Sequence, residues 1–547
     1  MASLSFLNKE RTIAKPGFNR WIVPPAALAI HLCIGMAYGF SVFWIPLSKS
    51  IGITKALVCP ETMGFFEKIF TTTCDWPISM LGWTFTMFFV FLGSSAAIFG
   101  SWVERSGPRK ATVACALLWC GGLVVSAVGV LVHQIWLIWL GAGVIGGIGL
   151  GLGYLSPIST LLKWFPDKRG MAGGLAIMGF GGGAMVGAPL AETLMKHFAS
   201  ATGAGVWQTF LVLAGIYFLF IMGGAFGYRV PPVDWKPEGW TPPIQKNKNA
   251  MITQGHVHVK TVLKTPQFWL LWGVICMNIS AGIGIIGMAS PMLQEVFGGR
   301  LIGLNLGYSE LTAEQLTQIA TIGAGFAGLL SLFNILGRFA WSSISDYIGR
   351  KNTFFIFFVL GITLYALVPT IRNTGSNALF VATFCVLVSI YGGGFATLPA
   401  YLADLFGTQM VSAIQGRVLT AWSTAGILGP VLVNYLREFQ LARGVPVSQA
   451  YDLAMYILSG LLVIGFVCNV FIKPVAKKFF MNDVELAQER QLAHDRNSGL
   501  AIEGKDKVSL VGKGNRKVVV YLAWLAVGIP MIYGFWNTIQ KAVQLFR

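Results

Sequence analysis

One arginine lies inside an otherwise apolar stretch of the sequence. Arg338 follows Leu332-Phe-Asn334-Ile-Leu-Gly337 and precedes Phe339-Ala-Trp341. A guanidinium stays charged at any physiological pH, and its planar set of donors suits the two oxygens of a carboxylate. A charge within a membrane span is costly and usually functional. Arg338 is therefore a candidate ligand for an anion; the alternative is that it reaches the membrane surface or pairs with a carbonyl or an acid of another helix.

Two charged turns repeat along the chain. The first reads Gly100-Ser-Trp-Val-Glu104-Arg105-Ser-Gly107-Pro-Arg109-Lys110, and the second reads Asp346-Tyr-Ile-Gly349-Arg350-Lys351. In each turn an acid ends a predicted helix, a glycine permits a sharp change of direction, and cations follow where they can pair with the acid. Ser342 stands in the second turn where Gly100 stands in the first. The repeat indicates a chain of two duplicated halves.

Patterns of enzyme catalysis are missing from the sequence. It has no phosphate-binding Gly-x-x-x-x-Gly-Lys-Ser/Thr, no Cys-x-x-Cys pair and no convincing nucleophile elbow. His256 and His258 alternate in one predicted loop, and two histidines are too few to indicate a metal site. We therefore expect a protein that is not an enzyme and that holds neither a metal nor a cofactor.

The elements that position these residues are predicted to be membrane helices. Hydrophobic residues make up 55% of the 547 and charged residues only 11%, whereas a soluble domain is about a quarter charged. Apolar windows of about 20 residues, long enough to cross a bilayer as helices, recur along the chain. They predict thirteen spans, at 22–46, 79–101, 111–132, 135–162, 170–194, 207–228, 268–290, 317–341, 353–371, 377–400, 414–436, 451–473 and 518–538.

The net charge of +18 follows the predicted membrane topology. Most Lys and Arg lie in the N-terminal arm, in alternate loops and in the segment 474–517, which places these parts in the cytoplasm of a bacterial inner membrane and the C-terminus in the periplasm. Nucleic acid is therefore not an expected partner. Cys59 and Cys74 share a loop that this topology places outside, where they either form a disulfide or stay free.

The repeated charged turn resembles the signature loop of the major facilitator superfamily. That resemblance implies an all-α membrane fold of two six-helix bundles, which rock about a central site, here with an additional C-terminal helix. We expect a monomeric carrier in the lipid bilayer. The expected domains are the N-terminal bundle 1–228, the cytoplasmic linker 229–266, the C-terminal bundle 267–473, the charged cytoplasmic segment 474–517 and the extra helix 518–547.

Longer motifs resemble the oxalate/formate antiporter family. They are Phe333-Asn334 through Gly349-Arg350, Trp164-Phe-Pro-Asp167-Lys168-Arg169-Gly170, Thr265-Pro-Gln-Phe-Trp269, and Tyr391-Gly-Gly-Gly-Phe395 followed by Phe406-Gly-Thr408. They spread over both halves. In that family an arginine of the eighth helix engages the substrate carboxylate, and Arg338 matches its position. The resemblance also implies an aromatic enclosure made by Tyr38, Tyr154, Tyr391 and Phe395.

The eleventh predicted helix departs from that family. Trp422 stands where the family's oxalate exchanger has a lysine, and Ala37 and Gly151 stand where it has polar amides. A dianion facing Arg338 alone would keep one charge unpaired in a dry cavity, at a cost of several kcal/mol. We therefore expect a secondary carrier of small carboxylates, favouring monocarboxylates over oxalate, that works by alternating access with Trp422 in its substrate site.

Three alternatives stay open. A proton-coupled monocarboxylate symporter needs a group that titrates within the membrane, and His31 is the candidate, although a lone histidine in a helix is more often a packing residue. A non-transporting membrane sensor of the same fold would use residues 474–547 to signal. A multidrug exporter would favour acidic rather than cationic residues in its spans.

Overall fold

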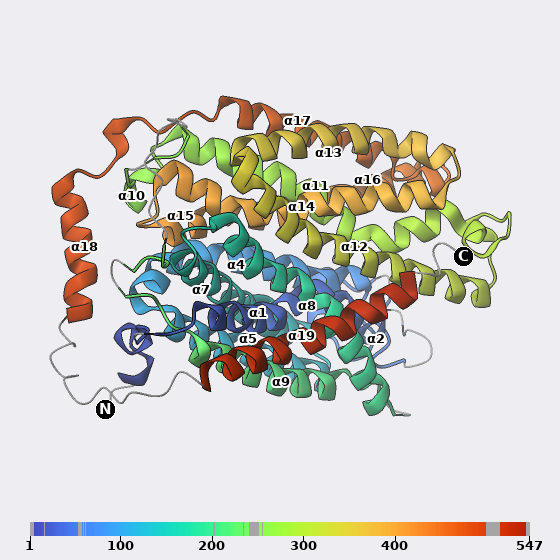
Figure 1. Cartoon of the computed structure of the whole chain (residues 1–547). Helices are drawn as coiled ribbons and strands as arrows, with labels where there is room; N and C mark the ends of the chain where they lie inside the picture. Colours follow the sequence, from blue (N-terminus) through green and yellow to red (C-terminus); the bar gives the residue numbers. More distant parts are fainter. Residues whose placement is uncertain are drawn as a thin grey trace.

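The computed structural model describes residues 5–542, apart from 16, 53–56, 58, 61, 201–202, 233–234, 240–250, 254 and 499–514. Apart from three isolated β-bridges, the described residues form helices and connecting loops. The helices gather in two bundles that lie side by side, the N-terminal bundle below the C-terminal bundle in Figure 1.

The first bundle contains six membrane-crossing units, several of them made of consecutive helical segments. After the short η1 (Ser5–Leu7) and η2 (Lys9–Thr12), its elements are η3 (Arg20–Ile22), α1 (Val23–Ile34), η4 (Gly35–Phe43), α2 (Trp44–Leu47), α3 (Phe65–Phe70), α4 (Ile78–Ser106), α5 (Pro108–Leu131), α6 (Ile135–Ile138), η5 (Trp139–Gly146), α7 (Gly147–Trp164), α8 (Arg169–Phe198) and α9 (Val206–Gly227).

The second bundle repeats this plan and is followed by two further helices. Its elements are α10 (Val259–Val262), α11 (Pro266–Phe297), η6 (Gly298–Ile302), η7 (Tyr308–Glu310), α12 (Ala313–Ile348), α13 (Arg350–Asn373), α14 (Asn377–Phe406), α15 (Val411–Val418), α16 (Thr420–Ala442), η8 (Val447–Gln449), α17 (Asp452–Phe471) and η9 (Lys477–Phe479), and the further helices are α18 (Asp483–Ser498) and α19 (Asn515–Ala542).

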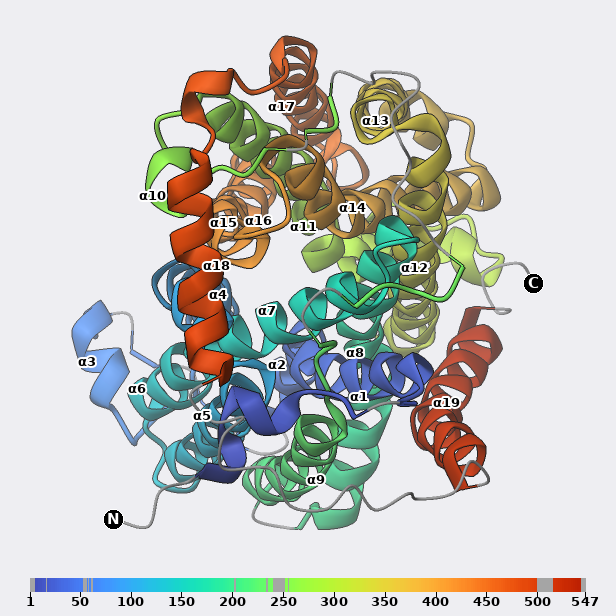
Figure 2. The same cartoon turned by 60° about the vertical axis from the view of Figure 1, so that its left-hand side comes forward.

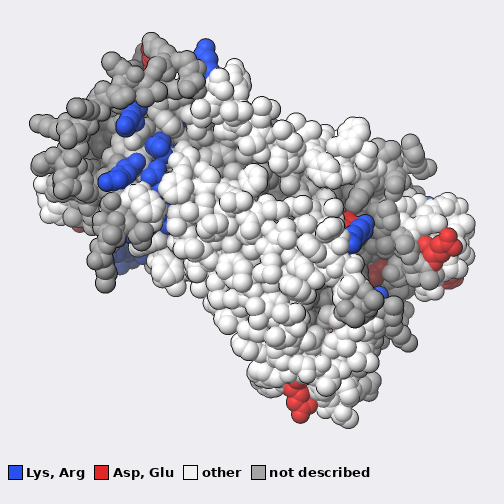
Figure 3. All heavy atoms as spheres, turned by 90° about the horizontal axis from the view of Figure 1, so that it is seen from below, with Lys and Arg blue, Asp and Glu red and all other residues white. Residues whose placement is uncertain are grey.

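Twelve helices of the described residues are long and apolar enough to cross a membrane, the last of them at Lys517–Gln540. They correspond to twelve of the thirteen predicted spans. The remaining predicted span, 317–341, lies in α12, a continuous helix of 36 residues. Figure 3 shows a broad band without charged side chains, with Lys and Arg gathered at one end of this face. The chain is thus a multi-pass membrane protein.

Two predicted spans are interrupted near the middle of the molecule. The first predicted span, 22–46, is confirmed at Arg20–Phe40, and within it α1 gives way to the 3₁₀ segment η4 at Gly35. A Cβ on Gly35 would lie 2.2 Å from the carbonyl oxygen of Phe180, so the break coincides with a close approach of α8. The eleventh span likewise breaks at Leu419, between α15 and α16. Both breaks lie close to residues of the predicted site, Tyr38 and Trp422.

Polar loops close the two ends of the molecule. At one end, α18 crosses from the second bundle toward the first (Figure 1), and Asp346 and Gly170 meet there. At the other end, Cys59 and Cys74 form a disulfide with a Cα–Cα distance of 5.1 Å. We call the first of these the Asp346 end. We call the second the Glu192 end, after a residue of α8 near that surface.

Candidate functional site

Arg338 lies at the interface of the two bundles and is fully buried. Its Nε donates to Oδ1 of Asn334, one turn earlier on α12, at 2.7 Å. Its Nη1 donates to the carbonyl oxygen of Ile177, on α8 of the other bundle, at 3.0 Å. No Asp or Glu of the described residues lies within ion-pair distance of it. The guanidinium is therefore held in place by neutral oxygens and keeps its charge uncompensated.

The aromatic residues expected around Arg338 do surround it. The Arg338 Cζ lies 5.5 Å from the centroid of the Phe395 ring, close enough for a cation–π interaction. Trp422 packs against that ring with centroids 4.3 Å apart and against Tyr154 at 5.3 Å. The hydroxyls of Tyr38 and Tyr391 share a hydrogen bond of 2.9 Å across the interface of the bundles. The six predicted binding residues thus pack into one cluster of side chains, which we call the chamber, with contributions from both bundles.

Three residues of this chamber were missed by sequence reasoning. Phe180 of α8 packs edge-on against Tyr38 at 5.1 Å and Tyr154 at 5.6 Å, and Phe89 of α4 lies 5.3 Å from Trp422. Asn334, which orients the guanidinium, stands four residues before Arg338. Helical spacing could have identified Asn334, since residues i and i+4 share a face.

Three donors in the chamber are buried without a hydrogen-bond partner among the described residues. They are Nη2 of Arg338, Nε1 of Trp422 and the hydroxyl of Tyr154. Buried donors are nearly always paired in proteins, and one left unpaired costs about 1–3 kcal/mol, more when the group is charged. One donor of the cation and two neutral donors beside it form a set suited to the oxygens of a bound anion.

A cavity of ≈ 450 Å³ approaches this chamber from the Glu192 end. Tyr38 and Asn334 line it, as do Glu192 and Pro189 farther out. Arg338 is not among its lining residues and lies behind Tyr38 and Asn334. Tyr38 of the chamber and Asn334, which accepts a hydrogen bond from Arg338, therefore border the cavity.

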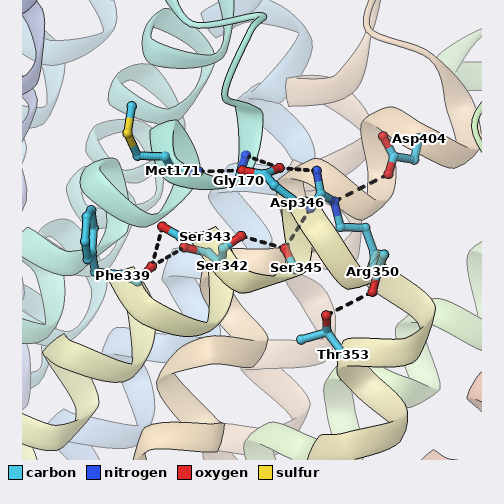
Figure 4. A network of polar contacts seen from close by, with 11 residues as sticks. Gly170, Met171, Phe339, Ser342, Ser343, Ser345, Asp346, Arg350, Thr353 and Asp404 are labelled. Atoms are coloured by element: carbon cyan, nitrogen blue, oxygen red, sulfur yellow. Dashed lines mark hydrogen bonds and ion pairs between the residues drawn. The ribbon is translucent and has the colours of Figure 1, made fainter.

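The second charged turn ties the bundles together at the Asp346 end (Figure 4). Asp346 accepts from the backbone N–H of Gly170 at 3.1 Å and of Met171 at 3.3 Å, both at the start of α8 in the first bundle. Arg350 holds the same carboxylate at 2.5 Å and lies 3.4 Å from Asp404. Gly349 has a φ of 86°, which favours glycine. This turn closes the Asp346 end of the interface.

The first charged turn makes its described contacts within its own bundle. Glu104 pairs with Lys163 of α7 at 2.8 Å, and Arg109 donates to the carbonyl oxygen of Phe6 at 2.8 Å. Gly107 has the same φ of 86° as its counterpart, Gly100 is buried and Lys110 is exposed. The two turns share their backbone geometry and differ in what their acids contact.

Of the histidines raised by the sequence, His31 packs against the chamber, with its ring centroid 5.5 Å from that of Tyr154 and 6.3 Å from that of Phe180. His31 is buried in the first bundle, with its ring nitrogens against the carbonyl oxygens of Tyr154, at 3.2 Å, and Ala176. His258 lies 3.6 Å from a carboxylate oxygen of Glu489 on α18. Among the described residues no group of three or more His, Cys, Asp or Glu could hold a metal ion.

Two helical bundles around a central charged chamber define a membrane carrier. The sequence pattern of the Major Facilitator Superfamily matches residues 27–430. The chain belongs to that superfamily, whose members are transporters rather than enzymes.

Similar proteins include carriers of small organic anions. The chain is 25% identical over 503 residues to the oxalate:formate antiporter of Oxalobacter formigenes, covering 89% of this chain and 100% of that one. It is 24% identical to apicoplast pyruvate carrier 1 of Toxoplasma gondii, covering 71% and 78% of the two chains. It is also 24% identical to monocarboxylate transporter 11 of Mus musculus, covering 76% and 81%.

Solved structures share the fold. The fucose:proton symporter of Escherichia coli superposes with a TM-score of 0.55 at 11% identity, covering 83% of this chain and 99% of that one. A bacterial homologue of the iron transporter ferroportin gives a TM-score of 0.52 at 14% identity, covering 82% and 98%.

Proposed function

We propose that this protein is a secondary carrier that exchanges small monocarboxylates by alternating access, with Arg338 as the ligand of the carboxylate. The relatives named above, an oxalate:formate antiporter, a pyruvate carrier and a monocarboxylate transporter, support this substrate class. The site residues are Arg338, Tyr38, Tyr154, Tyr391, Phe395 and Trp422, joined by Asn334 and Phe180.

The observation that carries the proposal is the uncompensated charge of Arg338 beside two unpaired neutral donors. A buried charge without a counterion costs several kcal/mol, and a bound carboxylate would remove that cost. One of its oxygens would accept a hydrogen bond from Nη2 of Arg338. Its remaining lone pairs would accept hydrogen bonds from Nε1 of Trp422 and from the Tyr154 hydroxyl. Aromatic walls exclude water and so strengthen the attraction between guanidinium and anion.

The chemistry of Trp422 favours a single negative charge on the substrate. Its indole N–H donates a hydrogen bond but brings no charge, so the chamber offers one cation, Arg338. A monocarboxylate balances that charge, whereas oxalate would bring a second negative charge that nothing described in the chamber compensates. Formate, lactate, pyruvate or a small hydroxy acid carries the single negative charge that this requires.

Exchange follows from the same electrostatics. The chamber is built from both bundles, so the bundles must rearrange around it when access changes sides. An empty chamber would carry an unpaired guanidinium through this step, whereas a loaded one is neutral. We therefore infer that return with a second anion is faster than return of the empty carrier.

Orientation follows from the distribution of charge. Because Lys and Arg are retained on the cytoplasmic side of membrane proteins, we assign the Asp346 end to the cytoplasm of a bacterial inner membrane. The cavity of ≈ 450 Å³ then opens to the periplasm.

The test is exchange of labelled formate, pyruvate, lactate and oxalate by the purified protein in liposomes. We expect Arg338→Gln to abolish exchange without lowering the yield of folded protein, because the anion loses its counterion. Arg443→Gln removes a cation from an exposed position and serves as the matched control. Exchange by Arg338→Gln at the rate of the control would refute the site.

Trp422 provides a second, finer test. Trp422→Phe keeps the aromatic wall and removes the N–H, so we expect a rise in KM of about tenfold for monocarboxylates, the loss of one hydrogen bond to a charged group. Trp422→Lys adds the cation that the chamber lacks and should shift the preference toward oxalate. An unchanged ratio of formate to oxalate transport in Trp422→Lys would show that Trp422 does not set substrate charge.

A further inference from the structure

The additional helix α19 is attached to the first bundle along its first half. Nε1 of Trp524 donates to the carbonyl oxygen of Trp21 at 3.1 Å, and Val527 packs against Leu28 and Ala29 of α1. Only 11% of the span is buried, so α19 lies at the periphery of the molecule, beside α1, α8 and α12 in Figure 2.

The last turns of α19 reach across to the second bundle. At Gly534 the backbones of α19 and α8 are so close that a Cβ would lie 2.9 Å from the carbonyl oxygen of Met185. One turn later Thr538 is 7% exposed and faces Gly328 of α12, whose Cβ would lie 3.8 Å from the Thr538 Cβ. Within four residues α19 therefore touches both bundles.

This crossing point is part of the wall of the cavity. Asn537 and Thr538 line the cavity together with Met185 of α8 and with Gly328 and Ser331 of α12. Toward the Asp346 end the two helices are joined directly, through Asp346 and through the bond from Arg338 to Ile177. Toward the Glu192 end the cavity lies between them, and α19 covers it from the side.

We propose that α19 is a lateral gate of the cavity: it seals the opening between α8 and α12 against the bilayer, moves with the first bundle, and slides over Gly328 when the bundles rock. Without this wall a hydrated anion would meet hydrocarbon on its way to Arg338, which a charged group avoids. Asn537 and Thr538 instead present an amide and a hydroxyl to the cavity. The gating part of this proposal rests on the transport function proposed above, and the sealing part does not.

Sealing is tested with a cysteine that reports on the cavity. Ser331→Cys places a thiol in the wall, and a lipid-soluble pyrene maleimide supplied from the bilayer measures its access. Gly328→Leu pushes Thr538 away, and we expect it to raise the labelling rate about tenfold, within the usual range for coupling between sites. Gly528→Leu changes α19 where a Cβ meets nothing within 4 Å and should leave the rate as in Ser331→Cys alone. Equal rates in all three proteins would overturn the seal.

Gating is tested with a removable tether. The 3.8 Å between the Cβ positions of residues 328 and 538 is the mean separation in disulfides, so Gly328→Cys with Thr538→Cys should cross-link on oxidation. We expect exchange of labelled formate or pyruvate to fall about tenfold or more and to recover on reduction. Wild-type protein taken through the same oxidation and reduction is the control.

Each outcome decides a separate claim. Failure of the pair to cross-link would show that Thr538 does not face Gly328, and unimpaired exchange by the cross-linked protein would show that α19 does not slide. If wild-type protein moves none of the carboxylates, the proposed function fails, while the labelling experiment still decides whether α19 seals the cavity.

Discussion

The two bundles meet along two seams, and the seams are built differently. One seam runs along α4 against α15 and α16, and we call it the α4 seam; the other runs along α8 against α12, and we call it the α8 seam. In the α4 seam a Cβ on Gly93 would lie 2.6 Å from the carbonyl oxygen of Leu419, and one on Gly416 would lie 2.3 Å from that of Ala96. Backbone thus packs directly on backbone there, through glycines.

The α8 seam is packed as closely only at the Asp346 end, where a Cβ on Gly170 would lie 2.3 Å from the carbonyl oxygen of Ser342. It is held by the carboxylate of Asp346 at one end and by Arg338 in the middle, and at the Glu192 end it contains the cavity and is covered by α19. The α4 seam is therefore close-packed at both of its glycines, whereas the α8 seam loses its close packing where the cavity begins. The comparison suggests that the α4 seam acts as the pivot and that the α8 seam is the side that opens.

The largest expected effect is on the α4 seam. Gly93→Ala places a methyl group against the carbonyl of Leu419, which cannot rotate away, so we expect a loss of about 2–3 kcal/mol, the upper range for overpacking. The measurement is thermal unfolding in detergent. Gly82→Ala on the same helix meets nothing within 4 Å and should be neutral or slightly stabilising. Equal unfolding temperatures for the two variants would mean that the α4 seam is looser than its geometry indicates.

A smaller effect is expected at the Asp346 end of the α8 seam. Asp346→Asn removes the charge that holds Gly170 and Met171, so we expect the population open at this end to rise about tenfold, or about 1.4 kcal/mol. Thiol labelling of Ser342→Cys, a nearly isosteric change at a fully buried position deeper in the seam, measures that opening. Glu104→Gln in the first turn is the matched control, because its partner Lys163 lies in the same bundle. If both variants open the seam equally, the contact between bundles is not what distinguishes the two turns.

Much of the fold could be predicted because membrane spans are encoded locally. A window of about 20 apolar residues is sufficient to define a span, and the turns at Glu104 and Asp346 reveal the duplication. The breaks at Gly35 and Leu419 could not be predicted, since the first coincides with a contact with α8, far away in the sequence. The position of α19 was unreadable for the same reason: apolar residues predict a span but not its neighbours.

The candidate site, like the fold, could be predicted only in part from the sequence. Arg338 was identifiable because a charge in an apolar window is rare, and the resemblance to the oxalate/formate antiporter family supplied the aromatic residues around it. Phe180 and Phe89 were missed because the chain has 39 phenylalanines, and nothing local distinguishes two that face a chamber from those that face lipid. The absence of an acid beside Arg338 among the described residues is a property of the assembled bundles alone.

The smallest expected effect tests whether the α4 seam is filled by backbone or by a side chain that can move. Ser423 donates to the carbonyl oxygen of Phe89 at 2.7 Å, and its hydroxyl also lies 2.0 Å from where a Cβ on Gly93 would be. Ser423→Ala alone should cost about 0.5–1 kcal/mol, one net hydrogen bond, measured by the same thermal unfolding.

Combined with Gly93→Ala, the substitution at Ser423 shows which group fills the seam. Ser423→Ala removes the hydroxyl, but the carbonyl of Leu419 stays 2.6 Å from the new methyl group. We therefore expect the double variant to recover only part of the stability that Gly93→Ala loses. Full recovery would show that a movable side chain rather than backbone fills the seam, and the α4 seam would then no longer qualify as the pivot, because side chains that can move aside allow the helices to slide.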